Sequence, residues 1–148
     1  MFTILIAGGT DSNNVPLVSA EFISDGTNNN NNLLPNLPKS IHWSPSMFLH
    51  NETIMLCGGE NNRKTCLKLQ EGTWTEYNSL KEERSNAAVV STTIATFIFG
   101  GSESNDTFEY LDKNASDWKL GTAYIPDSFR TGCSVANSHD EIWLIGGS

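Results

Sequence analysis

The side chains most suited to catalysis are few in this sequence, and their spacing is unfavourable. The three histidines, His42, His50 and His139, form no H-x-H or H-x-x-x-H pair of the kind that metal sites use. The acidic pairs Glu82-Glu83 and Asp140-Glu141 are adjacent, so on a strand their carboxylates would point to opposite faces and share no cleft. No G-x-S-x-G nucleophile motif is present. We therefore expect no catalytic residues, no metal site and no cofactor.

The three cysteines, Cys57, Cys66 and Cys133, are an odd number and contain no C-x-x-C motif. This pattern argues against a disulfide framework and against a zinc site. Cys57 and Cys66 flank one predicted hairpin loop, where we expect two free thiols, with a bridge as the alternative. A reducing compartment, and so a cytoplasmic location, is slightly favoured.

Three asparagines match the N-glycosylation pattern N-x-S/T: Asn51, Asn105 and Asn114. The simpler interpretation is chance in a chain rich in asparagine, and the alternative is an extracellular glycosylated protein. On the sequence alone, the localisation is unknown.

The size and charge of the chain exclude some classes of function. The 148 residues correspond to one ordinary domain, and the formal net charge of -8 disfavours binding to the phosphates of a nucleic acid. No apolar run approaches the roughly 20 residues that span a bilayer. The first residues, MFTILIAGG, lack a basic segment, so we expect a strand cut off at its start and not a signal peptide.

An apolar run that ends in two glycines occurs four times: FTILIAGG, TIMLCGG, ATFIFGG and EIWLIGG. Self-similarity at a spacing of 42 to 50 residues is typical of repeat architectures. The glycines follow no phosphate-binding motif, and they are expected to allow positive φ and close backbone approach at strand ends. The pairs are Gly8 and Gly9, Gly58 and Gly59, Gly100 and Gly101, and Gly146 and Gly147.

A second position recurs at a constant distance from the glycine pairs. Arg84 and Arg130 each lie 16 residues before the first glycine of the next pair, and His42 lies 16 residues before Gly58. Each of these three segments reads as a strand, a short polar turn and a more hydrophobic strand, which predicts a hairpin. A third strand and a strand next to Trp74 or Trp118 follow the second and third glycine pairs, and we expect both tryptophans in the core.

These features resemble the kelch repeat family, on the four glycine pairs, the two tryptophans and the two arginines. The resemblance implies an all-β fold, an incomplete β-propeller of four-stranded antiparallel blades. We expect a partial, degenerate blade over 1–41, blades over 42–83 and 84–129, and the first half of a further blade over 130–148. Five asparagines at 28–32 and the lack of a tryptophan in the first unit predict a disordered loop and a weak or missing outer strand.

About three blade-lengths are too few to close a ring, because propellers close with four to eight blades. We expect the remaining blades in a longer chain, or closure by self-association. Trp143, in the second strand of the last hairpin, is expected in the core.

The family resemblance implies a non-enzymatic scaffold that binds a partner protein or an acidic peptide, with substrate-recognition adaptors as one example. Arginines at the recurring position would form a basic rim that pairs with carboxylates. The alternative is that they bond only to backbone carbonyls of a neighbouring blade. The rim candidates are Arg84, Arg130, His42, Trp43, Ser85, Asn86 and Thr131.

Two other functions stay open. One is the non-catalytic part of a propeller enzyme similar to galactose oxidase, with its active site in further blades. Tyr77, Tyr110 and Tyr124 lie outside the strand entrances where the ligands of such a copper site would meet. The other is an extracellular binding propeller that carries glycans.

Overall fold

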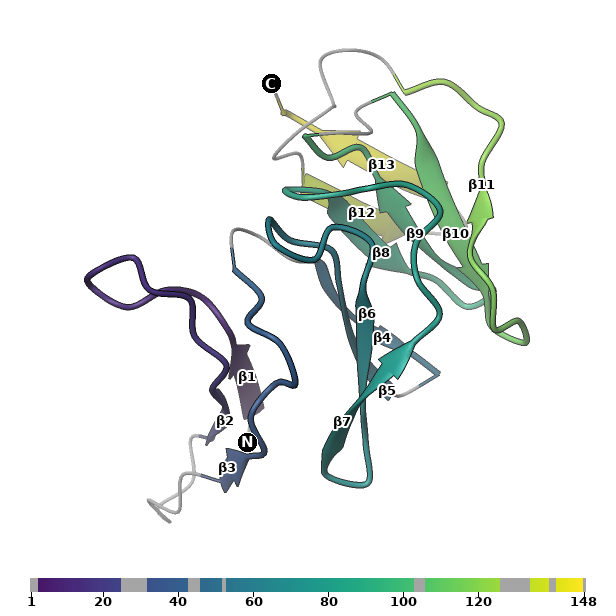
Figure 1. The fold of residues 1–148 in the computed structure, drawn as a ribbon. Coiled ribbons are helices and arrows are strands. Elements are labelled where there is room, and N and C mark those ends of the chain that lie inside the picture. Colours follow the sequence, from purple (N-terminus) through teal and green to yellow (C-terminus); the bar gives the residue numbers. More distant parts are fainter. Residues whose placement is uncertain are drawn as a thin grey trace.

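The computed structural model describes residues 3–24, 32–42, 46–51, 53–102, 106–125, 134–138 and 141–147. In these residues the regular structure consists of β-strands without any helix, so the prediction of an all-β chain is confirmed (Figure 1). The strands are β1 (Thr3–Ala7), β2 (Ala20–Ser24), β3 (Asn32–Leu34), β4 (Ser46–His50), β5 (Thr53–Cys57), β6 (Cys66–Gln70), β7 (Thr73–Tyr77), β8 (Ala88–Ser91), β9 (Ala95–Phe99), β10 (Phe108–Asp112), β11 (Lys119–Leu120), β12 (Ser134–Ser138) and β13 (Glu141–Ile145).

The strands form four antiparallel sheets, each made of consecutive strands. The first sheet is β1-β2-β3, the second β4-β5-β6-β7, and the third β8-β9-β10-β11, while β12 and β13 form the terminal hairpin. The strands of each sheet lie within one of the predicted units. In the first sheet the outer strand β3 has three residues, as expected for a weak strand, and asparagines 28–31 lie outside the described residues.

The sheets pack face to face, with the second sheet between the first and the third (Figure 1). Alternate residues of a strand point to opposite faces, so the second sheet contributes to two cores. Leu56, Leu67 and Trp74 pack with residues of the first sheet, and Met55 packs with residues of the third sheet. The first strands of the last three sheets are neighbours, since β4 lies beside β8 and β8 beside β12.

Cys57 and Cys66 form a disulfide, so the expectation of two free thiols is wrong. The two residues face each other on β5 and β6. The next pair outward, Gly58 and Thr65, is joined by a backbone hydrogen bond of 3.0 Å, which makes the cysteines a non-hydrogen-bonded pair. Such pairs bring Cα atoms closest, and here they lie 4.1 Å apart. The strand register therefore decided the bridge.

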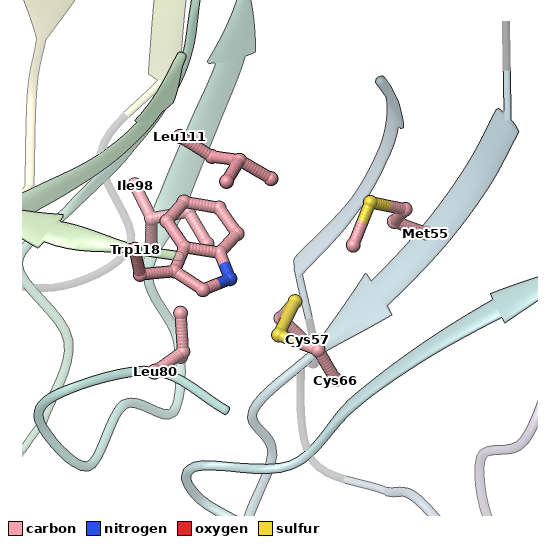
Figure 2. Packing of buried hydrophobic residues seen from close by; sticks show 7 residues of the cluster. All are labelled: Met55, Cys57, Cys66, Leu80, Ile98, Leu111 and Trp118. Atoms are coloured by element: carbon pink, nitrogen blue, oxygen red, sulfur yellow. A yellow bond between two sulfur atoms is a disulfide. The ribbon is translucent and has the colours of Figure 1, made fainter. Parts of the chain in front are cut away.

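The disulfide lies in the core between the second and third sheets. Figure 2 shows the indole of Trp118 between Leu80, Ile98 and Leu111 on one side and the disulfide and Met55 on the other. Trp118 and Trp74 are 1% and 5% exposed. The tryptophan at the recurring position is thus a packing residue in both four-stranded sheets.

Trp143 differs from the expectation, because 56% of its surface is exposed. Ile142 and Leu144 alternate with it on β13 and face the third sheet, where they line a cleft. Trp143 and Ile145 point the other way, and Ile145 is 59% exposed. No described strand covers that face of the hairpin.

Candidate functional site

The first two glycine pairs lie where their sheet meets the backbone segment that leads into the next sheet. Gly58 has φ 77°, and a Cβ atom there would come within 2.4 Å of the carbonyl oxygen of Arg84. Gly8 has φ 68°, and its Cβ would come within 2.2 Å of the carbonyl oxygen of Ile41. A side chain has no room at either position, so glycine is required by both φ and the close approach. These glycines serve the architecture.

The same contacts show that Ile41, not His42, occupies the position of Arg84. Gly9 N donates to Ile41 O at 3.1 Å, as Gly59 N donates to Arg84 O at 3.0 Å. The 16-residue offset aligns the hairpins themselves. In the residues that precede the hairpins, however, the position equivalent to Arg84 is one residue earlier than the offset predicts. The grouping of His42 with Arg84 is therefore wrong.

Two further backbone pairs agree with this register. Glu60 N donates to His42 O, and Ser102 N donates to Ser85 O, so His42 corresponds to Ser85. Four residues before Ile41 and Arg84 stand two buried leucines, Leu37 and Leu80, each 3% exposed. Leu37 N donates to Val18 O, just before β2, and Leu80 N donates to Lys64 O, just before β6.

Arg84 is almost completely buried, with 1% of its surface exposed, and its guanidinium donates in several directions. Nε donates to Glu109 Oε1 at 3.1 Å. Nη1 donates to Gly100 O at 2.7 Å and to Thr107 O at 3.1 Å. Nη2 donates to Thr107 Oγ1 at 2.9 Å and to Glu82 Oε2 at 3.2 Å. The guanidinium therefore joins the start of the third sheet to its second and third strands.

Glu109 completes this network and is fully buried, with 0% exposed. Its carboxylate also accepts hydrogen bonds from the backbone amides of Lys81 at 2.7 Å and Glu82 at 3.0 Å. A buried charge pair of this kind holds the loop before the third sheet in one conformation. Arg84 cannot offer its guanidinium to a partner carboxylate in this arrangement. The prediction that it contacts a partner is corrected to a structural role, in which its acceptors are two carboxylates, a hydroxyl and two backbone carbonyls of the third sheet and the loop before it.

The other rim candidates fall into three groups. His42 and Ser85 are buried, with 8% and 3% exposed. Asn86 is exposed, and its φ of 55° lies in the left-handed region that asparagine tolerates. Trp43, Arg130 and Thr131 lie outside the described residues. Asn86 is thus the described rim candidate that solvent reaches.

A polar pocket of about 440 Å³ lies at the opposite edge of the second and third sheets, among the turns that join their strands. No motif in the sequence indicates this pocket, although the polar turns at 50–52 and 92–93 occupy equivalent places in the repeat. Its lining residues are Leu49, His50, Asn51, Ser91, Thr92, Thr96 and Lys113.

A chain of hydrogen bonds runs through the pocket wall. His50 Nδ1 lies 3.1 Å from Thr96 Oγ1, which lies 3.0 Å from Ser91 Oγ. Burial lowers the pKa of His50, and the nearby Lys113 ammonium lowers it further. No carboxylate lines the pocket among the described residues, so His50 has no acidic partner there. The arrangement can hold a polar group, but it lacks a catalytic triad.

An apolar cleft of about 280 Å³ separates the third sheet from the terminal hairpin. Its floor is aromatic, with the rings of Phe99 and Phe108 stacked at 5.4 Å between centroids. Tyr124 and Leu144 form parts of its walls. Among the described residues no group of three or more potential ligands could hold a metal ion, and no helix is long and apolar enough to span a membrane.

The comparisons with known proteins inform the fold. No family model matches the sequence, and no curated protein matches it. A solved structure described as the structure of YjhT matches with a TM-score of 0.79 at 18% identity, over 98% of this chain and 56% of that chain. The chain thus has the fold of that part of the YjhT structure, and it spans about half of its length.

Proposed function

We propose that this chain is part of a kelch-type β-propeller that acts as a non-enzymatic scaffold for protein–protein interaction. The observation that carries the propeller is the order of the strands: the first strands β4, β8 and β12 lie side by side, and each sheet runs outward from them. Sheets arranged around a common axis are the plan of propeller blades. Further blades, from a longer chain or from a second copy, then close the ring.

The interaction surface in this proposal is the edge that carries the glycine pairs. Loops at this edge belong to several sheets, and a buried framework supports them. Arg84 and Glu109 hold the loop over 78–86 from its buried side, and Asn86 is exposed at the end of that loop. Exposed polar groups on a rigid support favour binding, because little conformational entropy is lost when a partner docks.

The partner is a protein or a peptide. The acidic-peptide version needs a basic rim, and its remaining candidate is Arg130, since Arg84 is buried. If the partner is a peptide, the specific role that we propose is that of an adaptor that recognises a substrate.

Selection of displayed peptides on the purified protein tests this function. Selected peptides should lose at least tenfold in affinity on the Asn86→Gly variant, which removes the side chain and tolerates the φ of 55°, as expected for a contact worth about 1.4 kcal/mol. Thr93→Ala, an exposed change at the opposite edge, is the matched control and should leave the affinity unchanged. For the acidic-peptide version, Arg130→Ala should weaken binding of a labelled oligoglutamate peptide without lowering the melting temperature.

Two results would overturn the scaffold proposal. One is selected peptides whose affinity depends on the turn edge and not on the glycine-pair edge. The other is turnover of a sugar or alcohol substrate by the full-length protein with bound copper.

A further inference from the structure

We propose that Asn114 carries an N-linked oligosaccharide and that the protein therefore folds in the secretory pathway. Two independent observations lead to this proposal. Asn114 is an exposed acceptor residue in a turn, and the core contains a buried disulfide.

The turn between β10 and β11 presents Asn114 to solvent without using its side chain. The turn is held by its backbone, because Lys113 N donates to Ile94 O and Ala115 N donates to Asp112 O, both at 3.0 Å. The side-chain amide of Asn114 has no hydrogen-bonding partner among the described residues. A glycan can therefore extend from Asn114 Nδ2 without breaking a contact of the fold.

The other acceptor asparagines differ from Asn114. Asn51 Nδ2 donates to Lys113 O, and Asn51 lines the polar pocket between the second and third sheets. A glycan at Asn51 would disturb this bond and cover the pocket. Asn105 lies outside the described residues. Among the described acceptors the structure assigns the glycan to Asn114.

The disulfide indicates the compartment in which the protein folds. Disulfides persist in secreted proteins and in the lumen of the secretory pathway, and they are rare in the cytosol. Cys57 and Cys66 are 1% and 0% exposed, so the bridge is a packed part of the core and not a surface contact. The expectation of a reducing compartment depended on free thiols. Because Cys57 and Cys66 form a bridge, that expectation no longer has support. N-glycosylation takes place in the compartment where this bridge forms.

The modification is a transfer of an oligosaccharide from a lipid pyrophosphate donor. A bond forms between Asn114 Nδ2 and the anomeric carbon of the first sugar, and the bond from that carbon to the phosphate oxygen breaks. One proton leaves Nδ2, and the lipid pyrophosphate is the leaving group. Ser116 completes the acceptor motif.

Mass spectrometry of the full-length protein from eukaryotic cells tests the proposal, with its own targeting signals retained. The tryptic peptide 114–119 should carry a glycan. Peptide N-glycosidase needs a residue before the asparagine, so the denatured protein is treated with it in heavy-oxygen water before trypsin, and Asn114 should then appear as labelled aspartate. Ser116→Ala keeps Asn114 but should abolish the modification and the accompanying shift on a gel. Asn13→Gln removes an exposed asparagine outside any acceptor motif and away from this turn, and it should leave the glycan in place.

Thiol trapping separates the two parts of the proposal. Alkylation in acid-quenched cells should leave Cys57 and Cys66 unlabelled. Unmodified Asn114 together with an intact bridge would overturn the assigned site. Labelled Cys57 and Cys66 would overturn the compartment.

Discussion

The two faces of the third sheet come from the same strands but are covered very differently. On the face toward the second sheet, Ile98 and Leu111 are fully buried and Trp118 is 1% exposed. The other face meets the terminal hairpin across an apolar cleft, and Trp143 on the far side of that hairpin is 56% exposed. An apolar strand that ends in two glycines is thus buried only where another sheet packs on it.

Charged groups follow the same division. Arg84 and Glu109 form a buried pair between the sheets, and Lys119 and Asp112 form a pair of 2.7 Å on the outer face of the same sheet. The side chains of the outer pair are 52% and 43% exposed. Comparison of equivalent groups on the two faces therefore separates the effect of residue type from the effect of burial.

The largest expected difference lies between two tryptophans. Trp118→Ala should lower the free energy of unfolding by about 3–5 kcal/mol, because it removes a large side chain from a closed core. Trp143→Ala should lower it by less than about 1 kcal/mol, since much of that side chain already contacts water. Urea titration followed by circular dichroism measures both. Equal losses would mean that the terminal hairpin is covered in solution.

The two charge pairs provide the second comparison. Arg84→Met leaves the Glu109 carboxylate buried without its cation, so unfolding should become easier by about 3–5 kcal/mol. Lys119→Met on the outer face should change stability by less than about 1 kcal/mol. The double variant Arg84→Met with Glu109→Leu should recover only part of the loss, because the backbone amides of Lys81 and Glu82 and the carbonyls at 100 and 107 still lose their partners. If Arg84→Met alone is tolerated, the guanidinium is free to act at the rim after all.

Replacement of the disulfide should have a smaller effect. The first sheet has Ala7 paired with Ala20 where the second sheet has its cysteines, so alanine fits this position of the repeat. Cys57→Ala with Cys66→Ala should cost roughly 2–3 kcal/mol, as the chain-entropy model predicts for a closed loop of nine or ten residues. The melting temperature of the wild type should fall similarly with a phosphine reductant, and that of the variant should not change.

The smallest expected effect concerns pH. The pKa of His50 lies below its ordinary value of 6.5, because burial and the Lys113 charge disfavour the imidazolium. The unfolded chain thus binds a proton near pH 6.5 that the folded chain does not bind, and stability should fall as the pH drops below that value. Melting temperatures between about pH 5 and pH 8 measure this slope, and His50→Gln should reduce it. An unchanged slope in that variant would assign the effect to another group.

Much of the local structure was predictable, because it follows from short-range rules. Short apolar runs before each glycine pair predict the strands, and the position of each tryptophan predicts a fourth strand beside it. The strands β4 and β8 also begin at the same distance from their glycine pairs, as the alignment indicates. Ile41 lies one residue farther from its glycine pair than the alignment indicates, and Pro45, between Ile41 and β4, is the sequence signal there that the alignment did not use.

The candidate sites depended on contacts that no spacing reveals. Arg84 and Arg130 look equivalent in sequence, yet the role of Arg84 follows from Glu109, which lies 25 residues away and faces the same interior. The polar pocket likewise joins His50 at the end of β4 to Ser91 at the end of β8 and to Lys113 in the turn after β10. Exposure and hydrogen-bond partners are properties of the packed sheets, so they were beyond the sequence.

The sequence by itself determined the strands, their antiparallel order and the need for glycine at their ends, because each depends on neighbours in the chain. The tertiary structure alone decided which apolar faces are buried, that Cys57 and Cys66 are bridged, and that the guanidinium of Arg84 points inward. These features depend on which residues a second sheet brings within a few ångströms. Arg84 is thus part of the framework beneath the proposed binding edge.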